Sequence, residues 1–585
     1  MAKNNWNKVG TRKRAGVLVP LFSVYSKNSL GIGDLADLKL LVDFCQKSGF
    51  TILQLLPMNE VGSTFCPYDA VSSFAIEPVY ISTLKGIAEA RKTYPAGRAH
   101  VDYKVKDVKM SLLKEVYDDG GSHDAREFKK FTEKNAYWID DFALFKVLKE
   151  HHKGRSWYEW DDAYIRRDKE SLQAFTKKHF KEIEFQKWVQ WNAFLQFVDA
   201  KSYAASKGVF ICGDLPILIS KDSADVWAHQ EFFKLDFAAG APPDMYCAKG
   251  QRWGMPTYDW DKIASDGYRY LKEKLKYAEN FYDILRVDHV VGLFRIWSIP
   301  YGEPQANEGL NGFFDPADEN VWKDHGVSIL SVMCENTKML LVAEDLGMIP
   351  KACPETLQEF RIPGNDVQRW TKDWVALHDF RPPGEYREMS VAMLSTHDTT
   401  NWAAWWENEA GTVDQALFIR KAIDRGIDYS SAQDRLFDPA RSRHGRLRWL
   451  DEIESIKVLV EILGKREEEV RDFIEMYENT YHEKEKLWKQ LGLKGPMKEK
   501  SGKEIIAAAL NITQKSRSIF CIELLMDYLN MAGILPGDPY NCRVNRPGTV
   551  SRDNWSLVIP MPLEELLRHR VCKEIKEMAG ASARI

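Results

Sequence analysis

The chain has 585 residues, of which 44% are hydrophobic and 28% charged, the balance of an ordinary soluble globular protein. A formal net charge of −4 gives no sign of a nucleic-acid partner, and no G-x-x-x-x-G-K-[ST] loop supports nucleotide hydrolysis. No apolar stretch is long enough to cross a bilayer, and no signal-type apolar run follows the basic N-terminal residues. The nine cysteines lack C-x-x-C spacing, which favours reduced thiols in the cytoplasm over a disulfide or zinc framework.

Short apolar runs that end in polar or charged residues recur along the chain, and we predict a strand at eight of them. In chain order they are Gly16–Pro20, Thr51–Pro57, Val209–Ile217, Tyr282–Val290, Met339–Leu346, Arg361–Trp370, Val391–Asp398 and Ser518–Met526. Most are rich in Val, Ile and Leu without strict alternation, which is typical of strands buried on both faces of a parallel sheet. Helical patterns lie between them, such as Asp34–Lys47 after the turn at Gly31–Gly33. This alternation predicts an α/β fold, a (β/α)8 TIM barrel.

Two long stretches interrupt the predicted barrel, at about residues 80–205 and about 405–515. Both are rich in Lys, Glu and Asp and in helix-forming residues. We predict that they are mostly helical insertion subdomains within a single catalytic domain that spans residues 1–585. The chain shows no internal repeat, which argues against a solenoid.

Four of the predicted strands carry a carboxylate at or near the C-terminal end, where barrels of this type place their reactive groups. These ends read Cys212-Gly213-Asp214, Arg286-Val287-Asp288, Ala343-Glu344-Asp345 and Thr396-His397-Asp398. Taken singly, each has an ordinary explanation: a helix cap, a structural ion pair, a solvated turn and a structural histidine, respectively. Their joint occurrence at strand ends of one barrel favours a catalytic site.

Such a set suits cleavage of a glycosidic bond, which requires two carboxyl groups that flank the anomeric carbon. One protonates the leaving oxygen, and in retaining enzymes the other attacks the sugar from about 5–5.5 Å away from the first. Arg286 lies two residues before Asp288, so both side chains point to the same side of a strand, and the positive charge keeps the carboxylate ionised. A third carboxylate and a histidine can hold sugar hydroxyls and favour ring distortion. This chemistry needs no metal or organic cofactor.

The motifs RVDH, AEDLG and STHD, preceded by GDLP, resemble the strand-end motifs of the α-amylase clan in the form found in the amylomaltase or disproportionating-enzyme family, the 4-α-glucanotransferases. Further similar segments are PLFSVYSKNSLGIGDLADL, PYDAVSSFAIEPVYIS, DSADVWA, APPDMYCAKGQRWGMPTYDW and VNRPGTVSRDNWS. They run from about residue 14 to residue 566, and GQRWG with the preceding PPD is specific to this family. The resemblance implies transfer of an α-1,4-glucan segment to the 4-hydroxyl of an acceptor glucan or glucose by a retaining double displacement.

The resemblance also implies a role for individual residues. Asp288 matches the nucleophile, Glu344 the general acid/base and Asp398 the carboxylate that stabilises the transition state. Contacts with the sugar are implied for Tyr68, Asp214, Tyr246, Trp253, Arg286 and His397. The aromatic residues among them have packing within their loops as the alternative explanation.

Three positions depart from the family pattern. Cys66 and Met255 stand where many relatives have Ser and Asn, and Met526 replaces the usual Gln before Asp527. None of these changes removes a catalytic carboxylate, but each bears on acceptor preference and substrate selectivity.

Two alternatives to a transferase are kept open. An α-glucan hydrolase of the same clan shares the first reaction step, although calcium-dependent members resemble one another in an Asn-His pair after strand three that this chain lacks. A silent glucan-binding scaffold is disfavoured because all three carboxylates are present. We expect maltooligosaccharides and α-1,4-glucans as donor and acceptor, no nucleic-acid or membrane partner, and a cytoplasmic location. The sequence leaves the oligomeric state open.

Overall fold

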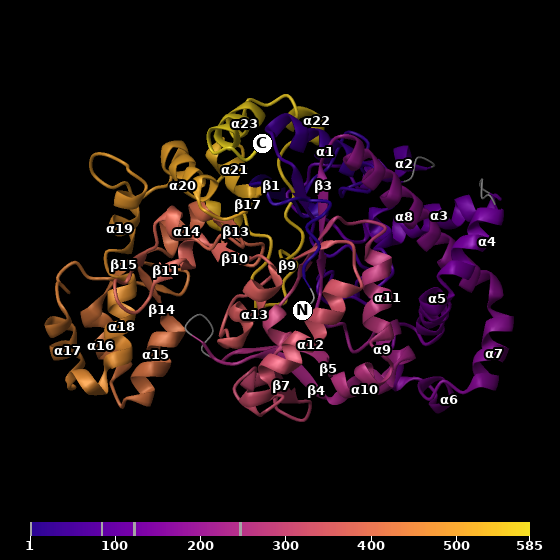
Figure 1. Ribbon diagram of the computed structural model, residues 1–585, viewed down its shortest axis with the longest axis horizontal. Helices are drawn as coiled ribbons and strands as arrows, with labels where there is room; N and C mark the ends of the chain where they lie inside the picture. The colour runs from indigo at the N-terminus through magenta and orange to yellow at the C-terminus, as the bar shows by residue number, and fades with distance from the viewer. Residues whose placement is uncertain (1–2, 83–85, 121–124, 245–248) are drawn as a thin grey trace.

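The structure of the chain, a computed structural model, describes residues 3–82, 86–120, 125–244 and 249–585 (Figure 1). Its centre is an eight-stranded parallel sheet with the strand order β10-β13-β17-β1-β2-β3-β6-β9. In chain order the strands are β1 (Arg14–Leu18), β2 (Ile52–Gln54), β3 (Phe210–Leu215), β6 (Ile284–Val287), β9 (Leu340–Ala343), β10 (Gly364–Val367), β13 (Ser390–Met393) and β17 (Phe520–Leu524). Each overlaps one of the eight predicted runs, and the predicted TIM barrel is confirmed.

The barrel strands are buried on both faces, which explains why their sequences read as apolar runs. Apart from Phe210, every residue of these eight strands is buried. The two ends of the sheet meet at β9 and β10, where the N–H of Ala343 donates to the carbonyl of Pro363 (2.7 Å). The sheet is therefore a nearly closed barrel, and the carboxyl ends of all its strands face the same side.

Helices surround the barrel. They include α1 (Asp37–Ser48), α8 (Phe180–Ser206), α11 (Arg269–Ala278), α12 (Trp322–Glu335), α13 (Ala352–Phe360), α20 (Lys503–Lys515) and α23 (Val571–Ala581). Helix α1 matches the predicted Asp34–Lys47 and ends at Gly49, whose φ of 76° lies in the left-handed region. The turn before it requires Gly33, because a Cβ atom there would lie 2.2 Å from the carbonyl oxygen of Leu21.

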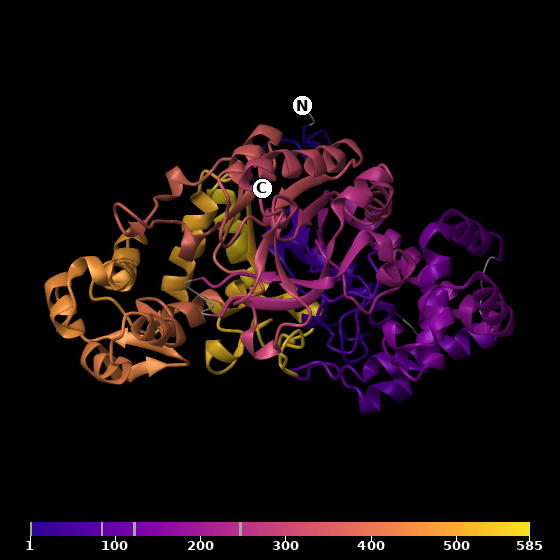
Figure 2. The same cartoon turned by 90° about the horizontal axis from the view of Figure 1, so that it is seen from below.

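The two insertions lie on opposite sides of the barrel (Figures 1 and 2). The first contains α2 (Ile87–Thr93), α3 (Val105–Asp118), α4 (Ala125–Lys134), α5 (Ala136–His151), α6 (Asp162–Ile165) and α7 (Lys169–Lys178), and it leads into α8. The second follows α14 (Trp402–Asn408) and contains α15 (Gln415–Asp424), α16 (Tyr429–Leu436), α17 (Ile456–Leu463), α18 (Arg471–Thr480) and α19 (Glu483–Gln490). The division into subdomains stays a prediction.

In the described part of the chain, two antiparallel sheets of more than two strands were not anticipated from the sequence. One, in the second insertion, has the order β14-β16-β15, with β14 (Thr412–Asp414), β15 (Phe437–Arg443) and β16 (Arg446–Trp449). The other has the order β5-β4-β7-β8, with β4 (Phe233–Ala241), β5 (Gln251–Tyr258), β7 (Ile296–Pro300) and β8 (Phe313–Asp315). Their strands are short, or only half-buried and charged, so they lack the apolar runs that identify the barrel strands.

Candidate active site

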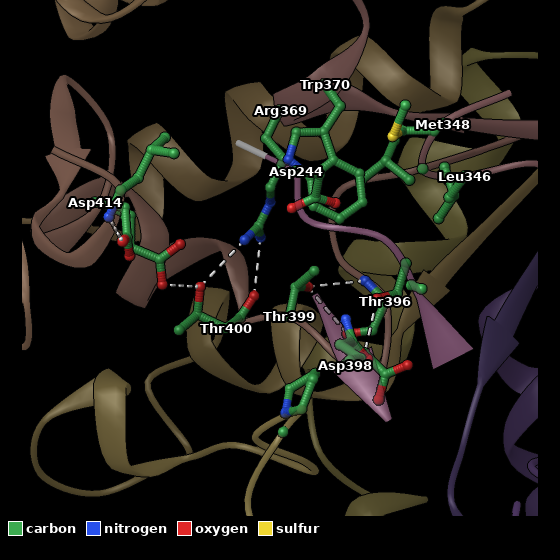
Figure 3. Close-up of a pocket in the computed structure, with 18 of the residues that line it drawn as sticks. Asp244, Leu346, Met348, Arg369, Trp370, Thr396, Asp398, Thr399, Thr400 and Asp414 are labelled. Atoms are coloured by element: carbon green, nitrogen blue, oxygen red, sulfur yellow. Dashed lines mark hydrogen bonds between the residues drawn. The ribbon is translucent and has the colours of Figure 1, made fainter. Parts of the chain in front are cut away.

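The carboxyl ends of the barrel strands open into a cleft of about 2570 Å³ (Figure 3). Eight of the nine predicted site residues come together there. Seven of them line the cleft, namely Tyr68, Trp253, Arg286, Asp288, Glu344, His397 and Asp398. The eighth, Asp214, is buried directly against Arg286. The ninth, Tyr246, lies outside the described residues.

A buried arginine organises the carboxylates at the ends of β3 and β6. Nη1 of Arg286 donates to both oxygens of Asp214 (2.7 Å each) and to Oδ1 of Asp288 (2.9 Å). The hydroxyl of Tyr68 donates to Oδ2 of Asp214 (2.7 Å). Burial disfavours the charged guanidinium, but the two aspartates hold the pKa of Arg286 well above its ordinary value.

Asp214 and Asp288 therefore play different parts around the same cation. The side chain of Asp214 is fully buried, so its place is that of a fixed counter-ion and not that of the helix cap considered from sequence. The side chain of Asp288 is 22% exposed and reaches into the cleft. The Asp288 carboxylate therefore lies between the Arg286 cation and the substrate space.

Glu344 follows β9 and is held by backbone donors. Its Oε2 accepts a hydrogen bond from the N–H of His289 (2.7 Å) and its Oε1 accepts one from the N–H of Leu346 (3.0 Å). Burial raises the pKa of Glu344 to about 7, with the charge of Asp288 adding to the effect and that of Arg286 opposing it. A carboxyl group with this pKa is partly protonated at neutral pH, as a general acid requires.

Asp398 follows β13 and is fixed from two sides. The amide of Asn545 donates to its Oδ1 (2.7 Å), and Nε2 of His397 lies 3.2 Å from its Oδ2. Burial opposes the charge, but His397 and the bond from Asn545 lower the pKa of Asp398 to about 2. Figure 3 shows Asp398 in a turn in which its N–H donates to the hydroxyl of Thr396 (3.3 Å). Asp398 is therefore an ionised carboxylate at the cleft near neutral pH.

Aromatic rings lie beside these carboxylates. Tyr68 stacks on His397, with ring centroids 5.1 Å apart, and Trp555 lies 5.9 Å from each of these two rings. Trp253, on β5, makes an edge contact with His289 at 5.0 Å. Trp370 also lines the cleft (Figure 3). Flat apolar surfaces next to charged groups are suited to bind the faces and the hydroxyls of sugar rings.

Asn545 and Trp555 were missed as site residues by the sequence analysis. Both lie in the segment VNRPGTVSRDNWS, which was matched to the family without a role for any residue in it. Asn545 is 147 positions from Asp398 in the sequence, and no strand-end pattern marks it. The resemblance of the segment to the family was the only signal that pointed to it.

The three departures from the family pattern have different surroundings. Cys66 lines the cleft, where burial raises the pKa of its thiol to about 12, and Met255 lines it from β5. Met526 is fully buried and does not line the cleft. Next to it, Oδ1 of Asp527 accepts a hydrogen bond from the N–H of Trp402 (2.6 Å) at the start of α14.

The chain is similar to known proteins in both sequence and structure. The model of glycoside hydrolase family 77, described as 4-alpha-glucanotransferase, matches residues 19–562. The chain is 32% identical to the 4-alpha-glucanotransferase of Chlamydia caviae over 97% of this chain and 94% of that protein. It is 33% identical to that of Aquifex aeolicus over 69% of this chain and 83% of that protein. An amylomaltase from Streptococcus agalactiae, solved with acarbose, has the same fold, with a TM-score of 0.71 and 22% identity over 98% of this chain and 100% of that one.

Proposed function

The chain belongs to the 4-α-glucanotransferase family, glycoside hydrolase family 77, and from this premise we propose how its own residues carry out the transfer. It is a glycosyl-transferring enzyme that moves part of an α-1,4-glucan to another glucan, and the family resemblance drawn from the motifs is confirmed. The proposal is a retaining double displacement with Asp288 as nucleophile and Glu344 as general acid and base.

The observation that carries this proposal is the contrast between two carboxyl groups on neighbouring strands. Val287 pairs with Ala343 in the register of β6 and β9, so Asp288 and Glu344 are the next residues on each strand. One carboxylate lies against the Arg286 cation, whereas burial raises the pKa of the other to about 7. Retaining glycosidases use two neighbouring carboxyl groups as nucleophile and acid, and the acid is the one whose pKa is raised.

In the first step Asp288 attacks the anomeric carbon, the bond from that carbon to the bridging oxygen breaks, and Glu344 gives its proton to the departing glucan. In the second step the 4-hydroxyl of an acceptor attacks the same carbon, Glu344 takes the hydroxyl proton, and the ester bond to Asp288 breaks. Asp398 and His397 hold sugar hydroxyls and stabilise the positive charge that develops on the ring.

The chemistry of the cleft also supports the proposed partners. Trp253 and Trp370 line the cleft and offer flat apolar surfaces to which an acceptor sugar can bind. Water gains no such binding, which favours transfer to a sugar over hydrolysis. We propose maltooligosaccharides and α-1,4-glucans as donors and acceptors, which the acarbose bound to the related amylomaltase supports. The eight cysteines that the structure describes form no disulfide, which supports the proposed cytoplasmic location.

The test begins with maltotriose and the purified chain. A ladder of longer maltooligosaccharides plus glucose, with little gain in total reducing ends, is the expected product of transfer. A steady rise in reducing ends without longer products would instead indicate a hydrolase.

Two variants then separate the roles, with α-maltotriosyl fluoride as second substrate because fluoride leaves with little help from an acid. Glu344→Gln should lose activity on maltotriose, yet release fluoride and accumulate an ester on Asp288 that peptide mass spectrometry detects. Asp288→Asn should lose both reactions while its melting temperature stays close to that of the unsubstituted chain. Near-normal turnover by Asp288→Asn would contradict the mechanism.

A further inference from the structure

The seam between β9 and β10 closes the barrel directly below Glu344. These two strands stand at opposite ends of the sheet order, and the bond from Ala343 to Pro363 joins their backbones. Above and below this bond, side chains bridge the two strands. Because β9 leads straight into Glu344, the way in which the seam is closed decides how firmly this residue is held.

At the lower end of the seam, the side chain of Asn4 bridges β9 and the segment before β10. Its Nδ2 donates to the carbonyls of Leu341 (2.7 Å) and Arg361 (3.2 Å), and its Oδ1 accepts from the N–H of Leu341 (2.8 Å). One side-chain amide thus pairs with the edge of β9 as a backbone peptide would. This end lies toward the N-termini of the strands, away from the cleft.

At the upper end, the carboxylate of Asp345 crosses the seam. Its Oδ1 accepts from the N–H of Asn365 on β10 (2.6 Å), and its other oxygen pairs with Arg387. Gly364 makes room for this carboxylate, since a Cβ atom there would lie 2.4 Å from Oδ2 of Asp345. Asp345 is 2% exposed, so it is not the solvated turn considered from sequence.

Arg387 fastens this crossing to β10. Its Nε and its backbone N–H donate to the two oxygens of Asp366 (2.8 and 2.9 Å), and its Nη2 donates to the carbonyl of Asn365. The guanidinium thus joins Asp345, which follows β9, to two consecutive residues of β10. Asp345, Asp366 and Arg387 also line the cleft.

We propose that Asp345 and Arg387 are positioning residues of the transfer reaction, which close the upper end of the seam and fix the backbone that carries Glu344. On its other side Glu344 is anchored to β6 and to the turn after it: its N–H donates to the carbonyl of Val287 (3.0 Å), and its own carbonyl accepts from the N–H of Val290 (3.0 Å). The neighbouring Asp345 supplies the matching anchor toward β10. This inference rests on the proposed role of Glu344 as acid and base.

The pair also adjusts the charge near Glu344. The groups that face its carboxyl are Arg286 and Asp288 from the end of β6, the backbone N–H groups of His289 and Leu346, and Asp345 from its own segment. The negative charge of Asp345 opposes ionisation of Glu344, and Arg387 balances that charge. Removing one partner or the other should therefore shift the titration of Glu344 in opposite directions.

The experiment compares Arg387→Met and Asp345→Asn with the unsubstituted chain, using maltotriose disproportionation over pH 5–9. Arg387→Met should lower kcat by about 10- to 100-fold with KM nearly unchanged, because a small displacement of a catalytic group slows the chemical step. The alkaline limb of its profile of kcat against pH should move to higher pH. The alkaline limb for Asp345→Asn should move to lower pH, and each shift should be about 0.5–1 pH unit. Arg387→Lys should recover part of the rate, since an ammonium can pair with one of the two aspartates but lacks the planar fork.

The matched control is Asn4→Ala, which opens the lower end of the same seam. It should lower the melting temperature while the pH profile and kcat at 25 °C stay within about twofold of the unsubstituted values. Gly364→Ala, on β10, should reproduce the loss of kcat by pushing the Asp345 carboxylate aside.

Failure of the inference can be told apart from failure of the proposed function. If the unsubstituted chain forms no product ladder, the proposed function itself is wrong. If it forms the ladder while Arg387→Met and Asp345→Asn keep its kcat and its pH profile, the positioning role is overturned. The same applies if Asn4→Ala shows the same loss of kcat and the same pH shift as Arg387→Met. If Arg387→Met fails to fold, Asp345→Asn and Arg387→Lys carry the test.

Discussion

Arg584 is fully buried at the N-terminal ends of β1 and β17, and its replacement by methionine is the perturbation whose effect can be worked out most directly. Its guanidinium donates to backbone carbonyl oxygens, those of Gln514 (2.5 Å), Ser518 (2.7 Å), Ser516 (2.9 Å), Ile519 (3.3 Å) and Arg14 (3.4 Å). Burial lowers the pKa of Arg584 from its ordinary value. The side chain therefore connects the starts of β1 and β17 to the end of α20 through buried hydrogen bonds.

The magnitude follows from the carbonyls that lose their donor. Ser516 and Ile519 also accept from Lys13 and from the N–H of Arg14, whereas the two shortest bonds go to Gln514 and Ser518. Each buried acceptor left unpaired costs about 1–3 kcal/mol, and methionine retains most of the packing, so we expect a loss of about 3 kcal/mol. A chain of this length unfolds with an entropy of about 1.2 kcal/mol/K, which converts this loss to a fall of about 2–3 °C in melting temperature.

Thermal unfolding followed by circular dichroism tests this value, together with maltotriose disproportionation at 25 °C. Activity should be unchanged, because the active-site cleft opens at the other end of the strands. The control is Arg12→Met, which removes an exposed arginine whose bond to the carbonyl of Ile585 is 3.4 Å long, and it should shift the melting temperature by less than about 0.5 °C. If the Arg584→Met chain has the same melting temperature as the unsubstituted protein, the reasoning is refuted.

Three further outcomes are expected from the same structure. The alkaline limb of kcat/KM should fall about tenfold per pH unit above about pH 7, because Glu344 must be protonated for the first step; a flat profile up to pH 9 would contradict this. Asn545→Ala should lower kcat/KM on maltotriose about 10- to 100-fold by removing a hydrogen bond to the charged Asp398, and unchanged kinetics would exclude a role for that bond. Burial raises the pKa of Glu523 from 4.5 to about 7. The stability that its protonated form contributes is therefore fully present below about pH 4.5 and is lost as pH rises through 7. Glu523→Gln should thus melt higher than the unsubstituted chain at pH 8 but not at pH 4.5, and an equal difference at both pH values would argue against this titration.

The barrel strands and three carboxylates could be read from the sequence for one physical reason. Strands buried on both faces must be apolar throughout, so each is a visible run, and an acid such as Asp288 or Glu344 directly after it stands out. The C-terminal ends of parallel strands share one side of the barrel, so strand-end acids gather without knowledge of the strand order. The motif resemblance added the expected roles of these residues and the family. The comparisons confirm the family.

The antiparallel sheets show where local sequence fails. In β15 the polar FDPARSR pairs with β16 to cover an apolar core built around Phe418 and Phe473 of the second insertion. A polar, mostly exposed strand of this kind is stabilised by its cross-strand partner and not by its own apolar pattern, so nothing in the segment alone distinguishes it from a loop.

What the sequence by itself determined is the set of eight buried strands, the acids at their ends and the family to which the chain is similar. Only the tertiary structure decided that Asn545 holds Asp398, that Asp214 is a buried counter-ion, and that Asn4 and Asp345 bridge the barrel seam. The reason is physical: a hydrogen bond between side chains far apart in the sequence depends on distance and orientation in space, and a single polar residue in a loop leaves no periodic pattern in the chain.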